Sequence, residues 1–97
     1  MMVLVTYDVE TVTPKGKKRL RHVSKQCVNY GQRVQNSVFE CVVDTSQFAV
    51  LKHLLLNCID QEKDSLRFYY MGSNWQNKVE HYGVKTSFNA EDDTLIA

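Results

Sequence analysis

The sequence predicts a single small domain of the α/β (α+β) class, with two helices packed against one antiparallel sheet. Apolar residues alternate between strand-like runs and helical spacing in the order βαββαβ. The chain has 97 residues, of which 43% are hydrophobic and 24% are charged, as in an ordinary soluble domain with one core. It contains no apolar run near the ~20 residues that a membrane span needs. With no basic leader before the first apolar run, we expect a cytoplasmic protein that does not bind membranes.

The first strand is expected over residues 3–9, where β-branched and aromatic residues form an almost continuous run interrupted by Asp8. Thr13 and Pro14 then have the residue types of an N-cap and a first helical position. The first helix should run from Pro14 to about Tyr30 and stop at Gly31.

Two short strands are expected between Arg33 and Val43, with the break near Asn36 and Ser37. Thr45 or Ser46 is expected to cap a second helix that ends near residue 59. A fourth strand over residues 66–70 shows alternation and is closed by glycine at position 72.

This order favours a ferredoxin-like βαββαβ two-layer sandwich over residues 1–74, with one face of the sheet uncovered. Residues 75–97 are expected to form a C-terminal extension with an extra edge strand around Val84, Thr86 and Phe88, followed by an acidic tail. An edge strand and an open sheet face can both pair with a second copy, so we expect a homodimer.

Positive charge is concentrated in one segment. Residues 11–39 contain seven basic residues and no acidic residue, whereas the rest of the chain holds five basic and all eleven acidic residues. Helical spacing places Lys18, Arg21, His22 and Lys25 opposite the apolar face of the first helix. A solvated helix face usually mixes both signs of charge, so this segment favours contact with phosphates.

Asp8 is the residue most suited to chemistry, because a carboxylate in an apolar strand needs water, a hydrogen-bond donor or a cation. Judged on the residues alone, Asp8 more simply terminates the strand and accepts turn amides. The alternative is a magnesium or manganese site made by two copies of Asp8 across a two-fold axis, since magnesium takes one or two carboxylates plus waters and phosphates.

Other catalytic patterns are missing. The sequence has no glycine-rich phosphate loop and no histidine pair at metal-ligand spacing. The cysteines at positions 27, 41 and 58 fall on apolar positions and are expected to be small core residues. Ser37, at the strand break, is treated as a turn or substrate-contact residue rather than a nucleophile.

Two motifs carry a resemblance: Tyr7-Asp8 at the end of the first strand, and residues 33–40, Arg-Val-Gln-Asn-Ser-Val-Phe-Glu, after a basic helix. In order and spacing, residues 2 to about 72 resemble the second of the two near-universal CRISPR adaptation proteins. The resemblance implies a ferredoxin-like homodimer that bridges two dimers of the CRISPR integrase and holds duplex DNA during spacer acquisition. It also implies a magnesium-dependent endonuclease that acts on single-stranded RNA or double-stranded DNA.

Carried over by position, Asp8 becomes the catalytic residue and the metal ligand, one from each subunit. The nucleic-acid or substrate surface is then expected to comprise Tyr7, Lys18, Arg19, Arg21, Lys25, Arg33, Ser37 and Phe39. Two other functions stay open: a non-catalytic architectural DNA-binding subunit, and an RNA-binding regulatory or toxin-type ferredoxin-like domain.

Overall fold

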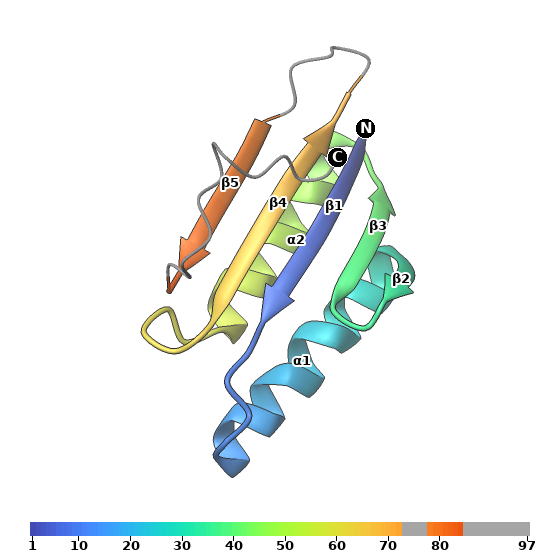
Figure 1. The fold of residues 1–97 in the computed structure, drawn as a ribbon. Coiled ribbons are helices and arrows are strands. Elements are labelled where there is room, and N and C mark those ends of the chain that lie inside the picture. The colour runs from blue at the N-terminus through green and yellow to red at the C-terminus, as the bar shows by residue number, and fades with distance from the viewer. Residues whose placement is uncertain (73–77, 85–97) are drawn as a thin grey trace.

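The structure, a computed structural model, describes residues 1–72 and 78–84. It contains a five-stranded antiparallel sheet in the order β2-β3-β1-β4-β5, with helices α1 and α2 covering one face (Figure 1). The elements are β1 (Met2–Asp8), α1 (Pro14–Tyr30), β2 (Gly31–Gln35), β3 (Val38–Val42), α2 (Thr45–Cys58), β4 (Ser65–Met71) and β5 (Lys78–Gly83). The first four strands and both helices confirm the expected ferredoxin-like two-layer sandwich.

The core lies between the sheet and the two helices. Alternate residues of β1 point into it, so Val3, Val5 and Tyr7 are buried. Val23 and Cys27 of α1 are buried at helical spacing, as the sequence predicts, and both apolar faces therefore meet in one cluster. Burying these side chains provides the main driving force for folding.

The opposite face of the sheet is not covered by any helix in the described part of the chain (Figure 1). The remaining residues of β1 lie on this side, and Leu4 stands between Glu40 of β3 and Tyr69 of β4. Val42 of β3 is 72% exposed. We call this side the open face.

Each helix begins after a residue whose side chain caps its first turn. The Thr13 hydroxyl accepts a hydrogen bond from the Gly16 amide at 3.1 Å, which confirms the predicted start of α1. The expected cap of α2 at Thr45 or Ser46 is wrong. Asp44 is the N-cap, because its carboxylate accepts from the Gln47 amide while the Gln47 side chain accepts from the Asp44 amide.

Gly31 joins α1 directly to β2, so the second strand starts two residues earlier than the sequence predicts. Its backbone is extended, and glycine is needed here because β3 lies very close to it. A Cβ atom at this position would collide with the Cys41 sulfur and the Glu40 carbonyl. The glycine lets the chain turn from the helix straight into the edge strand.

The fifth strand, β5, spans Lys78–Gly83, a segment in which we expected no strand, and Val84 follows it. Gly83 has φ +95°, a left-handed conformation that disfavours other residues. The expected strand residues Thr86 and Phe88 and the acidic tail lie outside the described residues. The division at residues 74/75 stays a prediction. In the ranges 1–72 and 78–84, no helix has the length and apolar character of a membrane span.

Candidate functional site

Asp8 is the last residue of β1 and its side chain is exposed. Alternation along the strand places it on the open face, opposite Tyr7. Within residues 1–72 and 78–84, no side chain or turn amide donates a hydrogen bond to its carboxylate, so the reading of Asp8 as an acceptor of turn amides is not supported. These residues also contain no group of three or more His, Cys, Asp or Glu side chains that could hold a metal ion.

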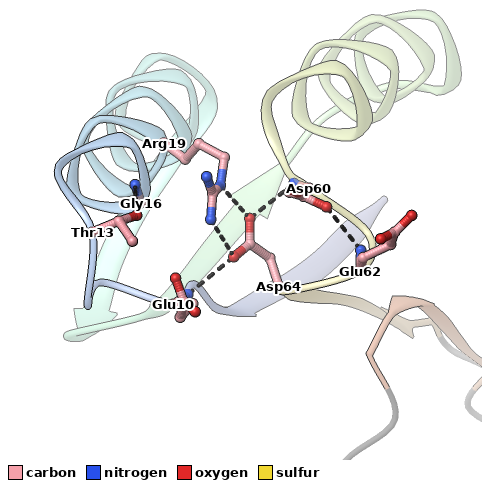
Figure 2. Close-up of polar contacts among 7 residues, drawn as sticks. All are labelled: Glu10, Thr13, Gly16, Arg19, Asp60, Glu62 and Asp64. Atoms are coloured by element: carbon pink, nitrogen blue, oxygen red, sulfur yellow. Dashed lines mark hydrogen bonds and ion pairs between the residues drawn. The ribbon is translucent and has the colours of Figure 1, made fainter.

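The chain that follows Asp8 is held by a second carboxylate, Asp64 (Figure 2). Asp64 is fully buried and accepts the backbone amides of Glu10 at 3.0 Å and Asp60 at 2.9 Å. The Arg19 guanidinium of α1 donates to its two oxygens at 2.8 and 3.2 Å. Asp64 therefore ties together the β1–α1 loop, helix α1 and the α2–β4 loop.

Burial opposes ionisation of Asp64, but the hydrogen bonds from Arg19 and from the two amides outweigh it, so its pKa is lowered. The same hydrogen bond raises the pKa of Arg19. The Arg19 side chain is only 17% exposed. The structure therefore differs from the expectation that Arg19 belongs to the nucleic-acid surface, because its charge is already paired inside the fold.

Lys18, Arg21, His22 and Lys25 are exposed along α1, as the helical spacing predicts. The first turns of α1 project beyond the end of β1 (Figure 1). α1 has no acidic residue in its first turn, so nothing there offsets the nearby positive charges. This arrangement creates a positive ridge beside the end of the central strand.

A hollow of about 520 Å³ lies between this ridge and the turn that joins β2 to β3. Three cationic side chains line it: Arg21, Lys25 and Arg33. Ser37 and Tyr7 also line it, and the Tyr7 amide donates a hydrogen bond to the Ser37 carbonyl at 3.2 Å. The fold thus brings together five of the predicted surface residues.

Arg33 is held in a defined position at the rim of this hollow. Its guanidinium donates to the Ser24 hydroxyl at 2.6 Å and to the Asn36 carbonyl. The guanidinium carbon also lies 4.8 Å from the centre of the Phe39 ring, a cation–π contact.

Phe39 does not lie on the surface. It is fully buried and its ring centre lies 6.2 Å from that of Tyr7 in a stacked pair. The expectation that Phe39 contacts substrate is not met in the folded chain, where it supports Arg33 and Tyr7 from beneath. Its strand position explains this, because alternate residues of β3 face the helices.

The Tyr7 side chain is 5% exposed, and its hydroxyl makes no hydrogen bond that meets normal geometry within the described residues. Burial raises the pKa of Tyr7, while the nearby Ser24 hydroxyl and Arg33 guanidinium partly lower it. With its pKa above the ordinary value of about 10, the phenol is protonated at neutral pH and can donate a hydrogen bond.

The structure does not bring Asp8 into this hollow, because Asp8 and Tyr7 point to opposite faces of the sheet. Sequence reasoning also missed Ser24, Asn36 and Asp64. Ser24 lies one turn after Arg21 on the basic helix, a spacing that could have indicated it. Asp64 offered no such signal, since its partner Arg19 resembles the other basic residues around it.

A family model described as CRISPR associated protein Cas2 matches residues 1–79. The chain belongs to the Cas2 family. This confirms the resemblance carried by the Tyr7-Asp8 and 33–40 motifs.

Curated Cas2 relatives match nearly the whole chain. A protein from Halalkalibacterium halodurans named CRISPR-associated endonuclease Cas2 is 60% identical over 99% of this chain and 100% of its own length. A protein from Nitratidesulfovibrio vulgaris named CRISPR-associated endoribonuclease Cas2 is 56% identical over 99% of this chain and 94% of its own length. The name of one relative thus specifies cleavage of RNA, whereas the name of the other specifies a nuclease without stating the nucleic acid.

Solved structures agree with the fold. The crystal structure of Streptococcus pyogenes Cas2 at pH 6.5 matches with a TM-score of 0.70 and 66% identity, over 78% of this chain and 92% of the other. A hypothetical protein from Thermus thermophilus matches with a TM-score of 0.57 and 24% identity, over 88% of this chain and 82% of the other. The second likeness concerns the fold alone.

Proposed function

We propose that this protein is a CRISPR adaptation subunit that binds nucleic acid and, as a homodimer, hydrolyses phosphodiester bonds with magnesium or manganese held by Asp8. Membership of the Cas2 family, together with an exposed carboxylate at the end of the central strand, carries the proposal. The nuclease names of its relatives support the reaction class.

The carboxylate of Asp8 supplies only part of the ligand set that a hard divalent cation needs. Magnesium prefers oxygen ligands and keeps several waters, so a carboxylate from each of two subunits with a substrate phosphate would form a sufficient set. The metal would neutralise developing negative charge and lower the pKa of a bound water. The protein's contribution is to hold Asp8 through β1 and the Asp64 hydrogen bonds.

The basic ridge on α1 is proposed to bind phosphates along the strand or duplex. Lys18, Arg21 and Lys25 are exposed on one helix and carry one sign of charge. Contacts of this kind recognise the backbone rather than base edges, so the proposed binding does not depend on sequence.

The second candidate is a purely architectural subunit that bridges integrase dimers without cleaving DNA. One observation favours it: the described part of the chain contains no group of three or more histidine, cysteine, aspartate or glutamate side chains that could hold a metal ion. The two candidates share the basic ridge and differ in whether they need Asp8.

A cleavage assay on purified protein tests the proposal. Asp8→Asn keeps the shape of the side chain and removes its charge, so cleavage of single-stranded RNA or duplex DNA should fall by about a hundredfold or more, as should cleavage of wild type in a chelator. Glu62→Gln removes another exposed carboxylate, one that makes no side-chain hydrogen bond, and should leave the rate unchanged.

If Asp8→Asn and the chelator both leave cleavage undiminished, Asp8 is not the metal ligand. If the wild type never cleaves, yet both it and Asp8→Asn support spacer integration with the integrase, the architectural candidate is correct instead.

A further inference from the structure

Ser65 is the cross-strand neighbour of Asp8 on the open face. The register of β1 and β4 places the two residues directly opposite one another. Cross-strand partners in an antiparallel sheet point to the same face, with their Cβ atoms about 4.5–5.5 Å apart. Leu66 and Phe68 of β4 are fully buried on the helix side, so alternation also places Ser65 on the open face. A carboxylate and a hydroxyl therefore stand side by side at this end of the face.

The strands on either side of this pair add no side chain opposite it. The pairing of β1 with β3 ends at Thr6 and Val38, so no residue of β3 pairs with Asp8. On the other side Ser65 pairs with Gly83 of β5, and glycine has no side chain. Ser65 is thus the residue that the described sheet pairs with the Asp8 carboxylate.

The positions of both residues are fixed by Asp64 (Figure 2). Its carboxylate accepts the amide of Glu10, two residues after Asp8, at 3.0 Å, and Asp64 itself directly precedes Ser65. The Arg19 guanidinium holds the same carboxylate from α1. Supporting hydrogen bonds of this kind hold the side chains of a binding site in place before the ligand arrives.

The Ser65 hydroxyl is accessible for a further interaction. Ser65 is half-buried, and within residues 1–72 and 78–84 its hydroxyl makes no hydrogen bond. The next side chain of β4 on this face, Arg67, donates to His81 of β5 at 2.9 Å, on the side away from β1. A hydroxyl both donates and accepts hydrogen bonds, so it suits the waters that magnesium keeps when it binds a carboxylate.

We propose that Ser65 is a positioning residue of the metal site, whose hydroxyl hydrogen-bonds to a water molecule retained by the cation at Asp8. The hydroxyl does not replace the carboxylate of the second subunit but adds a partner beyond the direct ligands. Loss of such a partner typically costs about ten- to a hundredfold in metal affinity. The inference rests on the metal site of the proposed function.

The test is a titration of the full chain with manganese(II), without nucleic acid, so that it does not depend on cleavage. Manganese accepts the same oxygen ligands as magnesium. The electron paramagnetic resonance signal of the free aqueous ion falls as the ion binds, which gives the dissociation constant. We expect wild type to bind, Asp8→Asn to lose binding, and Ser65→Ala to bind about tenfold more weakly.

Two further substitutions isolate the hydroxyl, because threonine and valine have the same shape. Ser65→Thr should keep the wild-type affinity within about twofold, whereas Ser65→Val should weaken binding as much as Ser65→Ala does. Thr6→Val is the matched control, since it removes a hydroxyl from the same face at a position opposite Arg67, and it should leave the affinity unchanged. Thermal melts of the Ser65 variants should match wild type, because the hydroxyl has no partner in the described structure.

Equal manganese affinity in Ser65→Thr and Ser65→Val would overturn the role of Ser65, as would equal losses in Ser65→Ala and Thr6→Val. If Ser65→Ala does not fold, the comparison of the threonine and valine variants decides. If Asp8→Asn loses binding while Ser65→Ala binds as wild type does, only this inference fails and the proposed metal site stands. Wild-type affinity in Asp8→Asn, or no binding by wild type, would overturn both.

Discussion

At the scale of single residues, burial separates two carboxylates that look alike in the sequence. Asp8 is exposed at a strand end and is free to meet a cation. Asp64 is fully buried and has four hydrogen bonds from Arg19, Glu10 and Asp60. A buried carboxylate with this many donors stays ionised and acts as a structural anchor.

The anchor can be tested by pH. Because the pKa of Asp64 lies below its unfolded value of about 4, its ionised form stabilises the fold above that pH, and the contribution is lost as pH falls through the folded pKa. Asp64→Asn should lower the free energy of unfolding by about 2–4 kcal/mol at pH 7. The difference from wild type, measured by urea unfolding, should shrink toward pH 3.

Glu62→Gln is the matched control, since its exposed side chain makes no hydrogen bond in the described structure. A constant difference between wild type and Asp64→Asn from pH 7 to pH 3 would contradict the assignment of the pH dependence to Asp64.

At the scale of elements, the start of α2 depends on reciprocal hydrogen bonds rather than on the first hydroxyl residue in its sequence. Asp44 and Gln47 exchange bonds of 2.7 and 2.9 Å, while Thr45 and Ser46 already lie inside the helix. These bonds satisfy amides that the first turn would otherwise leave without partners.

Asp44→Ala should therefore destabilise the protein by about 1 kcal/mol and lower the melting temperature by roughly 4–8 °C. Ser46→Ala should have a much smaller effect, because Ser46 makes no capping bond. Thermal melts followed by circular dichroism check both variants, and equal losses in the two would show that Asp44 is not the cap.

At the scale of the whole molecule, the sheet is asymmetric. Two helices bury one face, and the other exposes apolar side chains such as Val42, which pairs with Met2 at the opposite end of β1 from Asp8. Such a face is suited to a two-fold contact, which would bring two copies of Asp8 toward one another as the proposed metal site requires. The expected homodimer is thus part of the proposed function.

Leu4→Lys places a charge in the middle of the open face, which the proposed two-fold contact would bury. We expect it to give the mass of a single 11.3 kDa chain by light scattering at concentrations where wild type gives twice that mass. Val50→Lys changes a 50% exposed residue on α2 and should remain a dimer. The open-face contact is wrong if Leu4→Lys still dimerises.

The sequence by itself determined the order of the first six elements, the apolar and basic faces of α1 and the family, because periodicity and the motifs at Tyr7-Asp8 and 33–40 are local properties of the chain. It did not predict β5 at Lys78–Gly83, and it chose the wrong cap for α2. Local propensity does not specify which strand edge or which amide a residue will meet.

Only the tertiary structure decided which of the predicted surface residues are buried, which line the hollow and which lie on the open face. Arg19 and Phe39 turn inward, Arg21, Lys25 and Arg33 meet around the hollow, and Asp8 stands on the other face. The physical reason is that contacts such as that between Arg19 and Asp64 join residues 45 positions apart. Sequence spacing cannot encode such contacts, because chain packing alone determines which charges lose water and find partners.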